Sequence, residues 1–375
     1  MWYSTGFSAD GLKWGRFRFL PEISTSEIYT DNVYLDPTDE RSESITTISP
    51  KLAIDFAIAP MNYITLKYNG DYRIYSKSDN FKKYIQQIDL LWTLTTPKGS
   101  AFKVGTRADF NSIQPYSERD RFKDYTETEA YADIHIPLGT SLDGGIRYGH
   151  LSQNFDDPIY AADEFERDTV TLNILYKRLP FTTPLIEYTF YHQNNNDILN
   201  FSTDMDVQIL LVGAQWEPTA KLSGYLKGGY YQAKLDNGDD SGGLAIDTNM
   251  AYRLSDFVQL SLTLFRRLGT SISAARETGN YYIATGGDFS VSYSRWEPLT
   301  MIMDVSYQNN KYKQKGTIFD EHRTDKYYSA GIQAKYSPRD WLSFGLGYHY
   351  KKNDTNFATD KYRENRIQAS ISFAI

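Results

Sequence analysis

The sequence has 375 residues, a formal net charge of -7 and no cysteine, with 15% aromatic and 23% charged residues. The lack of cysteine excludes a disulfide framework and thiolate metal sites, and the negative charge without a basic stripe argues against a nucleic-acid partner. No apolar run approaches the roughly 20 residues that a membrane-spanning helix needs, so a helical membrane protein is excluded.

The mean hydropathy of -0.53 is a value that soluble proteins also have. A transmembrane β-barrel gives a similar average, because half of every strand faces water. The length of the alternating segments therefore decides between the two classes. No signal peptide is visible, so we expect the sequence shown to be the mature form of an exported protein.

The N-terminal segment 1–15 contains Trp2, Tyr3 and Trp14 but shows no clear period. We expect it to be a periplasmic leader, a plug segment or a loosely ordered terminus. Alternation begins at about residue 16, so the predicted barrel domain spans residues 16–375.

The segment 62–75, with the sequence NYITLKYNGDYRIY, shows the alternation most clearly. Ile64 and Leu66 occupy even positions, whereas Lys67 and Asp71 occupy odd ones. Because successive side chains of a strand point to opposite faces, this pattern predicts a strand with one apolar and one charged face. The segment is longer than the about 5–6 residues of a typical globular strand, whereas roughly 9–11 residues span a bilayer.

The same alternation recurs along the chain up to its last residue, as the terminal strand of such a barrel does. Further segments of this kind are 102–111, 127–136, 170–177, 244–253, 258–264, 301–308, 342–351 and 367–375. The segment 207–216 is less regular, because its apolar residues change phase after Leu211. This change predicts either a β-bulge or the arrival of the strand at its rim.

Two kinds of connection separate these segments. Eight are short and mostly marked by Pro, at 59–62, 97–100, 137–139, 179–184, 217–219, 254–256, 297–299 and 337–340. Nine are longer and polar, at 31–41, 77–82, 114–123, 156–163, 194–200, 236–243, 270–280, 313–326 and 353–360.

Short turns on one rim and long loops on the other are typical of outer-membrane barrels, whose short turns are periplasmic. Seventeen connections join about eighteen strands, and an even number places both termini on the same rim. A repeat near 40 residues also suits a propeller, but each repeat here holds two long strands instead of four short ones. We therefore predict an all-β fold: a single transmembrane, antiparallel, up-and-down β-barrel with longer extracellular loops.

Large aromatic residues cluster beside the short turns. Amphipathic rings favour the bilayer interface, so we interpret them as one membrane-interface girdle. The predicted interface aromatics are Trp216, Trp296, Tyr336 and Trp341.

The inward phase is rich in charges of both signs, which must be hydrated or paired. The predicted pore-lining residues are Lys67, Asp71, Arg73, Asp89, Lys103, Arg107, Asp109, Glu127, Glu129, Tyr131, Asp133, Arg147, Glu187, Tyr191, Tyr225, Lys227, Asp247, Arg253, Asp304 and Lys335. A barrel of about eighteen strands is too wide for side chains to fill. We expect a hydrated lumen without strong ion selectivity, in which the inward tyrosines, Tyr231 included, either stack on sugar rings or brace the wall.

Catalytic and metal sites are not predicted. His135 has inward carboxylates nearby on its own strand, Asp133 and Glu129, but no nucleophile lies beside a base, and we expect His135 to be a wall residue. The Asp- and Gly-rich loop at 236–243 lacks the ligand spacing of a calcium loop, so we interpret it as a solvated loop. No cofactor is expected, and we do not expect an enzyme.

Two stretches resemble a known family. Residues 27–35, EIYTDNVYL, and residues 45–50, ITTISP, are similar to the start of the putative β-barrel porin 2 family, outer-membrane proteins of Gram-negative exopolysaccharide loci. The similarity covers about residues 16–55. The position of Asp31 and Asn32, where a strand turns into its loop, suits hydrogen bonds from side chain to backbone.

The resemblance implies a conduit that exports an exopolysaccharide across the bacterial outer membrane. Its expected partners are outer-membrane lipid and lipopolysaccharide, the polysaccharide chain in transit and a periplasmic export or co-polymerase protein. Two alternatives stay open: a general diffusion or sugar-uptake porin, and a barrel that scaffolds a lumen-bound partner.

Overall fold

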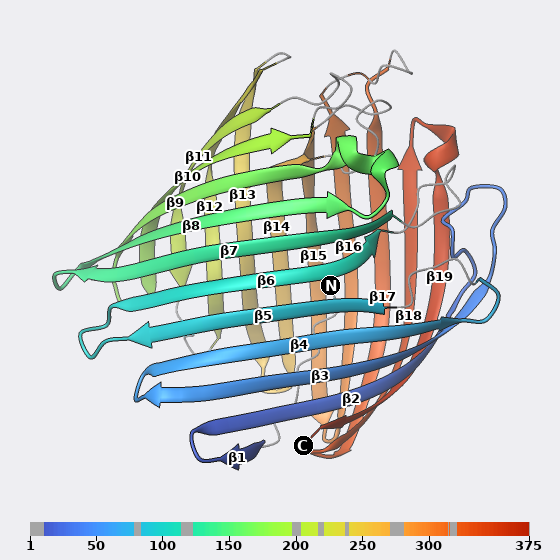
Figure 1. Cartoon of the computed structure of the whole chain (residues 1–375), viewed down its shortest axis with the longest axis horizontal. Helices are drawn as coiled ribbons and strands as arrows, with labels where there is room; N and C mark the ends of the chain where they lie inside the picture. The colour runs from blue at the N-terminus through green and yellow to red at the C-terminus, as the bar shows by residue number, and fades with distance from the viewer. Residues whose placement is uncertain are drawn as a thin grey trace.

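The structure is a computed structural model in which one antiparallel sheet closes on itself (Figure 1). It describes residues 11–78, 84–113, 123–196, 204–216, 221–236, 240–270, 281–313, 315 and 321–374. Within this part of the chain the sheet has nineteen strands, of which β2 to β19 form the closed ring of eighteen, since β19 pairs with β2. The predicted fold class is confirmed.

The strands follow one another around the ring in chain order. They are β1 (Leu12–Trp14), β2 (Phe17–Thr30), β3 (Glu43–Ala59), β4 (Asn62–Tyr75), β5 (Tyr84–Thr95), β6 (Ala101–Ile113), β7 (Lys123–Leu138), β8 (Leu142–Phe155), β9 (Phe165–Tyr176), β10 (Thr182–Asn195), β11 (Met205–Trp216), β12 (Leu222–Leu235), β13 (Ser241–Ser255), β14 (Val258–Thr270), β15 (Tyr281–Trp296), β16 (Leu299–Tyr312), β17 (Thr324–Arg339), β18 (Leu342–Thr355) and β19 (Tyr362–Ala374). Two 3₁₀ turns, η1 (Pro158–Asp163) and η2 (Ala358–Asp360), lie in the long loops. No described helix has the length and apolarity to cross a membrane.

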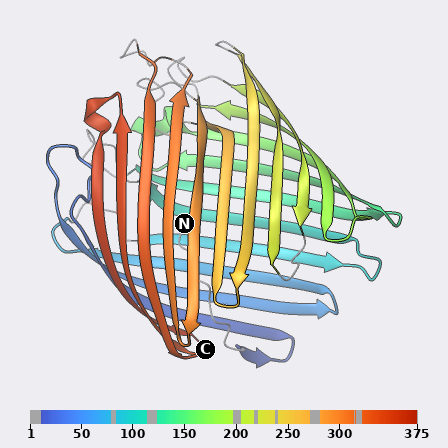
Figure 2. The same ribbon diagram turned by 180° about the vertical axis from the view of Figure 1, so that it is seen from behind.

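The two rims of the barrel differ as the sequence predicts. Turns of a few residues join strands at the short-turn rim, where the chain also ends, and longer connections join them at the long-loop rim (Figure 2). Gly99 and Gly139 sit in short turns with φ of 87° and 85°, a region that a Cβ disfavours. The four register shifts of the ladders all lie beside short turns, the first between Ala57 and Ala59.

The two faces of the sheet have opposite chemistry. On β4 the even positions, such as Leu66 and Ile74, are exposed apolar residues, and the odd positions carry Lys67 and Asp71. We call the first set the outer phase and the second the lumen phase, and we follow both around the ring through the cross-strand partners. The apolar outer phase would contact lipid, because hydrocarbon is its favourable environment.

Strand β11 differs from its prediction. Its register with β10 and β12 is continuous from Met205 to Trp216, so the phase change of apolar residues near Leu211 needs no bulge. Apolar side chains occupy both faces of this strand. The lumen-phase set, which includes Val207 and Leu211, is buried in packed clusters.

Strand β1 lies outside the ring. It pairs with Phe17–Phe19 of β2, beyond the point at which β19 ends its pairing, Ala374 opposite Glu22. β1 therefore borders the part of β2 that β19 does not reach. Residues 1–10 of the predicted leader or plug lie outside the described residues, and the role of the segment stays a prediction.

Candidate functional site

The lumen is the candidate site, and the cross-strand partners place all twenty predicted pore-lining residues on the lumen phase. They do not form one cluster. Most lie on the wall from β4 to β8, a second group joins β10, β12 and β13, and Arg253, Asp304 and Lys335 are spread over β13, β16 and β17.

The wall from β4 to β8 carries a row of alternating charges. Lys67 lies opposite Asp89, Asp89 opposite Arg107, and Arg107 opposite Glu129. The Nε of Arg107 is 2.6 Å from Asp109 and 3.9 Å from Asp89. Because opposite charges alternate between adjacent strands, their fields largely cancel over a few ångströms.

A second charged row runs parallel to the first. Lys103 lies opposite Asp133, and Asp133 opposite Arg147. The guanidinium of Arg147 also donates to Glu129 at 2.9 Å and lies 4.4 Å from the ring centre of Tyr131. The two rows are therefore joined into one network of mixed sign. Nearby on β4, Asp71 accepts a hydrogen bond from Ser49 at 2.6 Å.

A separate charged group lies on β10, β12 and β13. The Nζ of Lys227 is 3.0 Å from Glu187 and 2.7 Å from Asp247, and Tyr225 donates to Asp247 at 3.1 Å. Lys227 Nζ also lies 4.7 Å from the ring centre of Tyr225. These predicted residues are thus brought together and compensate one another.

The opposite wall is rich in hydroxyl groups and less densely charged than the wall from β4 to β8, a difference the sequence analysis missed. Its lumen-phase hydroxyl residues include Ser24, Ser26, Ser261, Thr263, Ser290, Ser292, Ser306, Ser329, Ser343, Ser370 and Ser372. Ser306 and Ser329 are hydrogen-bonded to each other at 2.5 Å. The signal was present in the sequence, because Ser recurs at every second position of 290–292, 370–372 and 24–26.

His135 is paired with a residue that the sequence analysis did not consider. Its Nε2 lies 3.1 Å from Asp143 on the neighbouring strand β8, and Lys177 also contacts Asp143. This arrangement links the wall near a short turn. In the part of the chain that the structure describes, no group of three or more His, Asp or Glu side chains is placed to hold a metal ion. Of the loop 236–243, residues 237–239 lie outside the described residues, and residues 241–243 already belong to β13.

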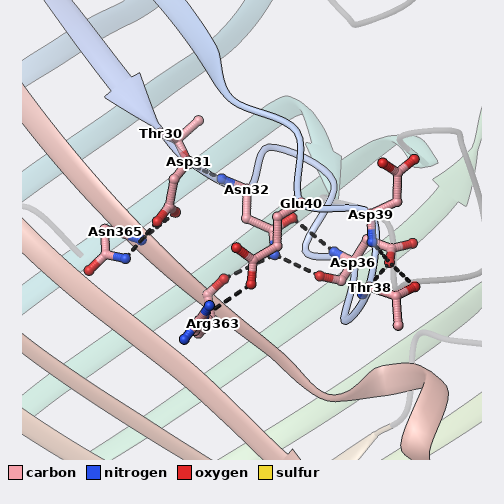
Figure 3. A network of polar contacts seen from close by, with 9 residues as sticks. All are labelled: Thr30, Asp31, Asn32, Asp36, Thr38, Asp39, Glu40, Arg363 and Asn365. Atoms are coloured by element: carbon pink, nitrogen blue, oxygen red, sulfur yellow. Dashed lines mark hydrogen bonds and ion pairs between the residues drawn. The ribbon is translucent and has the colours of Figure 1, made fainter.

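The first long loop is tied to the last strand (Figure 3). Asp31 accepts hydrogen bonds from the backbone N–H and the side-chain amide of Asn365, at 2.7 and 2.6 Å. The buried Asn32 amide donates to the carbonyl oxygens of Asp36 and Arg363, at 2.8 and 3.0 Å. The expected turn bonds are present for Asn32, which is hydrogen-bonded to the backbone of Asp36. The bonds of Asp31 to Asn365 and of Asn32 to Arg363 instead cross the junction between β2 and β19.

Asp36 organises the tip of the same loop. Its carboxylate accepts the backbone N–H groups of Thr38 and Asp39, each at 2.8 Å (Figure 3). Partial burial works to raise the pKa of Asp36, but these backbone donors outweigh it, and the pKa lies below its ordinary value.

Buried polar side chains secure other long loops. Glu43 is 1% exposed and accepts hydrogen bonds from Ser76, at 2.5 Å, and from Ser78, at 2.8 Å. Arg323 is ion-paired with Asp325 at 2.9 Å and with Asp360 at 2.5 Å. These contacts join the described ends of the loops to one another at the long-loop rim.

Three of the predicted interface aromatics, Trp216, Trp296 and Tyr336, lie on the outer phase beside the short turns, and Trp341 lies in the turn before β18. Trp296 packs edge-on against Tyr293, Tyr336 stacks on Phe344, and Trp341 stacks on Phe373. Trp216 ends β11 at the same rim.

A second band of outer-phase aromatics lies toward the long-loop rim and was missed. It comprises Tyr29, Tyr72, Tyr84, Phe110, Tyr148, Tyr230, Tyr307, Tyr328 and Tyr348. Tyr72 contacts Tyr84, and Tyr307 contacts Tyr328, with ring centres 4.8 and 5.2 Å apart. Two such bands with apolar residues between them are the pattern of a bilayer-spanning barrel.

Comparison with known proteins gives one family match, a profile described as putative beta-barrel porin 2, over residues 163–374. These residues lie outside the N-terminal motifs that suggested the resemblance. No curated protein matches the sequence.

Several solved structures have the same fold. The outer membrane protein OpdK of Pseudomonas aeruginosa aligns with a TM-score of 0.51 at 10% identity, covering 95% of this chain and 99% of that one. A BenF-like porin of Pseudomonas fluorescens Pf-5 gives 0.52 at 11% identity, with 95% and 99% covered, and OccAB4 of Acinetobacter baumannii gives 0.51 at 9%, with 95% and 98% covered. Similarity at this level shows the fold alone.

Proposed function

The chain belongs to the putative β-barrel porin 2 family, and on that premise we propose that it is a passive channel for small hydrophilic solutes. The coarser statement, an integral porin-like barrel of the outer membrane, follows from the family and the fold. The direction of transport and the size of the transported solute are what we propose.

The observation that carries the proposal is the charge-balanced wall inside a closed ring of eighteen strands. Such a ring encloses more space than side chains fill, and barrels near this size keep an aqueous channel. Charged side chains such as Lys67, Asp89 and Arg107 need water around them. A hydrated, compensated wall lets small polar solutes of either charge pass.

The inward tyrosines favour a channel for small solutes over a polysaccharide conduit. Arg147 lies over the ring of Tyr131 and Lys227 over that of Tyr225, while Tyr191 and Tyr231 are buried. Of the two expected roles of these tyrosines, the contacts support bracing of the wall over stacking on sugar rings. Neither the family description nor the solved neighbours point to export, and scaffolding of a lumen-bound partner has no such support either.

The test is the channel activity of the pure protein in lipid. We expect stable single-channel steps in a planar bilayer, and swelling of proteoliposomes in small sugars that falls as the sugar grows. A barrel that is folded by heat-modifiable gel mobility but neither conducts nor supports swelling would refute the proposal. In a deletion strain, loss of extracellular polysaccharide with unchanged uptake of small solutes would favour export instead.

Charge substitutions in the wall give a sharper prediction with a matched pair. Arg107→Gln should shift selectivity toward cations and Asp89→Asn toward anions, because each removes one sign from a balanced row. A unit charge about 8 Å from a passing ion in water changes its energy by about 0.5 kcal/mol, so the permeability ratio should change about twofold. Reversal potentials in a KCl gradient measure both shifts. Shifts of the same sign would contradict the balanced-wall interpretation.

A further inference from the structure

The ladder between β13 and β14 opens toward the long-loop rim. Its last pair is Ile246 opposite Arg266, although β13 begins at Ser241 and β14 ends at Thr270. Over this stretch β13 stays paired with β12, and β14 with β15. The sheet therefore forks, with β13 on one branch and, on the other, residues 267–270 of β14 paired with residues 281–284 of β15, which we call the end of the β14–β15 hairpin.

The end of the β14–β15 hairpin is buried on its outer face, which in a regular barrel wall would be exposed to lipid. Leu268, Tyr281 and Ile283 share the outer phase with Leu264 and Phe289, which are 42% and 40% exposed. Tyr281 and Ile283 are nevertheless only 3% and 2% exposed. Their burial shows that another part of the protein covers this outer face.

The covering side chains come from the lumen phase of β10 to β13. Leu268, Tyr281 and Ile283 belong to apolar clusters whose other members are Tyr191, Met205, Val207, Ile209, Leu211, Tyr231, Ala233, Leu235 and Ala245. The inner face of β10–β13 therefore covers the outer face of the hairpin end, so the hairpin end lies on the lumen side of β10–β13. The hairpin end thus leans into the mouth of the barrel.

The fork is stabilised at its base. Arg266, on the outer phase, donates to the carbonyl oxygen of Leu244 at 3.1 Å and to Thr285 Oγ1 at 2.9 Å, which supplies a donor where the ladder ends. The backbone is close-packed beside it, because a Cβ on Gly286 would lie 2.3 Å from the carbonyl oxygen of Tyr307. Only glycine fits this approach.

A second arrangement of the same strands is available without a change of register. Continuing the existing ladder would place Leu244 opposite Leu268 and Gly243 opposite Gly269. That upright arrangement would gain the missing ladder hydrogen bonds and lose the apolar packing of the docked one. The upright state has the ladder hydrogen bonds and the docked state has the apolar packing, so the two states can be close in free energy, as a two-state element requires.

From this geometry we propose that the end of the β14–β15 hairpin is a gate at the mouth of the lumen. Docked against β10–β13 it narrows the mouth, and upright in the wall it widens it. The proposal rests on the channel function, and it concerns only whether and where that channel is regulated.

Engineered cysteine pairs can trap the upright state, because the chain has no cysteine of its own. Leu244 is 66% exposed on the outer face of β13, whereas Leu268 is partly buried against the apolar clusters, so Leu244→Cys/Leu268→Cys should crosslink only when the hairpin stands upright. The matched control is Met250→Cys/Leu262→Cys, which lies opposite in the same register below the fork. Its crosslink should form at once.

The expected result is a slower but complete crosslink in the test pair, accompanied by a larger single-channel conductance that returns to the parental value on reduction. The control pair should crosslink without changing conductance. No crosslink in the test pair, or a crosslink without a conductance change, would overturn the gate. Absence of any channel conductance in the parental protein, which has no cysteine, would instead overturn the proposed channel function.

Thiol labelling gives a second readout that does not depend on forming a disulfide. In the docked state Ile283→Cys should react with a water-soluble maleimide about 10–1000 times more slowly than Asp288→Cys, the range set by a minor open population. Equal rates would show that the hairpin end is not docked and would contradict the proposal.

Discussion

At the scale of single residues, the junction between the first and last strands depends on short polar side chains. Asn32 is 0% exposed, and its amide joins the backbone of its own loop to that of β19, 331 positions away. A buried side chain in such a place acts as a clamp, because removing it leaves several backbone groups without partners.

Asn32→Ala should therefore lower the free energy of unfolding by about 1–3 kcal/mol, the cost of unpaired buried polar groups. The matched control is Thr38→Ala in the same loop, where the exposed side chain donates a hydrogen bond to Asp36 and the expected change is within about 0.5 kcal/mol. Denaturant titration of the barrel in lipid vesicles measures both. Equal effects of the two substitutions would contradict the clamp.

Asp36 makes the same loop sensitive to pH. Its folded-state pKa is lowered, so its stabilising effect is present above the ordinary carboxyl value of about 3.9 and is lost as the pH falls through the folded pKa. Hydrogen exchange of the Thr38 and Asp39 amides, corrected for intrinsic rates, should accelerate in acid and stay protected above about pH 5. Asp36→Asn should remove this pH dependence, and a persisting acid transition would assign it to another group.

At the scale of the strand, the alternation of side chains decides what each substitution costs. Leu262→Arg, in the middle of the outer phase of β14, should destabilise the barrel by about 2–4 kcal/mol. Its neighbour Thr263→Arg should cost little, because Thr263 faces the lumen opposite Asp288. Folding titrations of the two variants in lipid vesicles test this difference, and a reversed order would contradict the assignment of faces.

The same alternation explains how much of each strand the sequence alone could predict. β4 has the bounds 62–75 that its pattern predicts, because lipid on one side and water on the other demand opposite chemistry at adjacent positions. β11 was misinterpreted because its two faces meet two apolar surroundings, lipid at Leu210 and the packed clusters at Val207 and Leu211. Alternation along one strand cannot predict that another part of the same sheet packs against its lumen face.

For the site, the phase of the charged residues was predictable and their partners were not. Arg107 and Glu129 could be assigned to the lumen face from their own strands, but the row that joins them depends on the register between β6 and β7. Likewise, the bond from Asn32 to Arg363 requires the closed ring. Contacts between residues so far apart in the sequence depend on the whole fold, so no local sequence pattern predicts them.

At the scale of the molecule, the ring closes without help from β1. Deleting residues 1–15 should leave assembly and conductance unchanged, because β1 pairs only with Phe17–Phe19 and not with β19. Planar-bilayer recordings of the shortened protein, compared with the full chain, provide the measurement. A rise in conductance would show that the N-terminal segment plugs the lumen, as one of the sequence-based expectations has it.

The two aromatic bands also define the bilayer thickness that matches this barrel. Tyr336 and Tyr328 lie eight positions apart on β17, about 26 Å along the strand. With a strand tilt of about 35–45°, the height between them is about 20 Å, well short of an average hydrocarbon thickness of about 30 Å. Lipids of ordinary length would have to compress around the protein, so it should partition into the thinnest bilayer the cell offers.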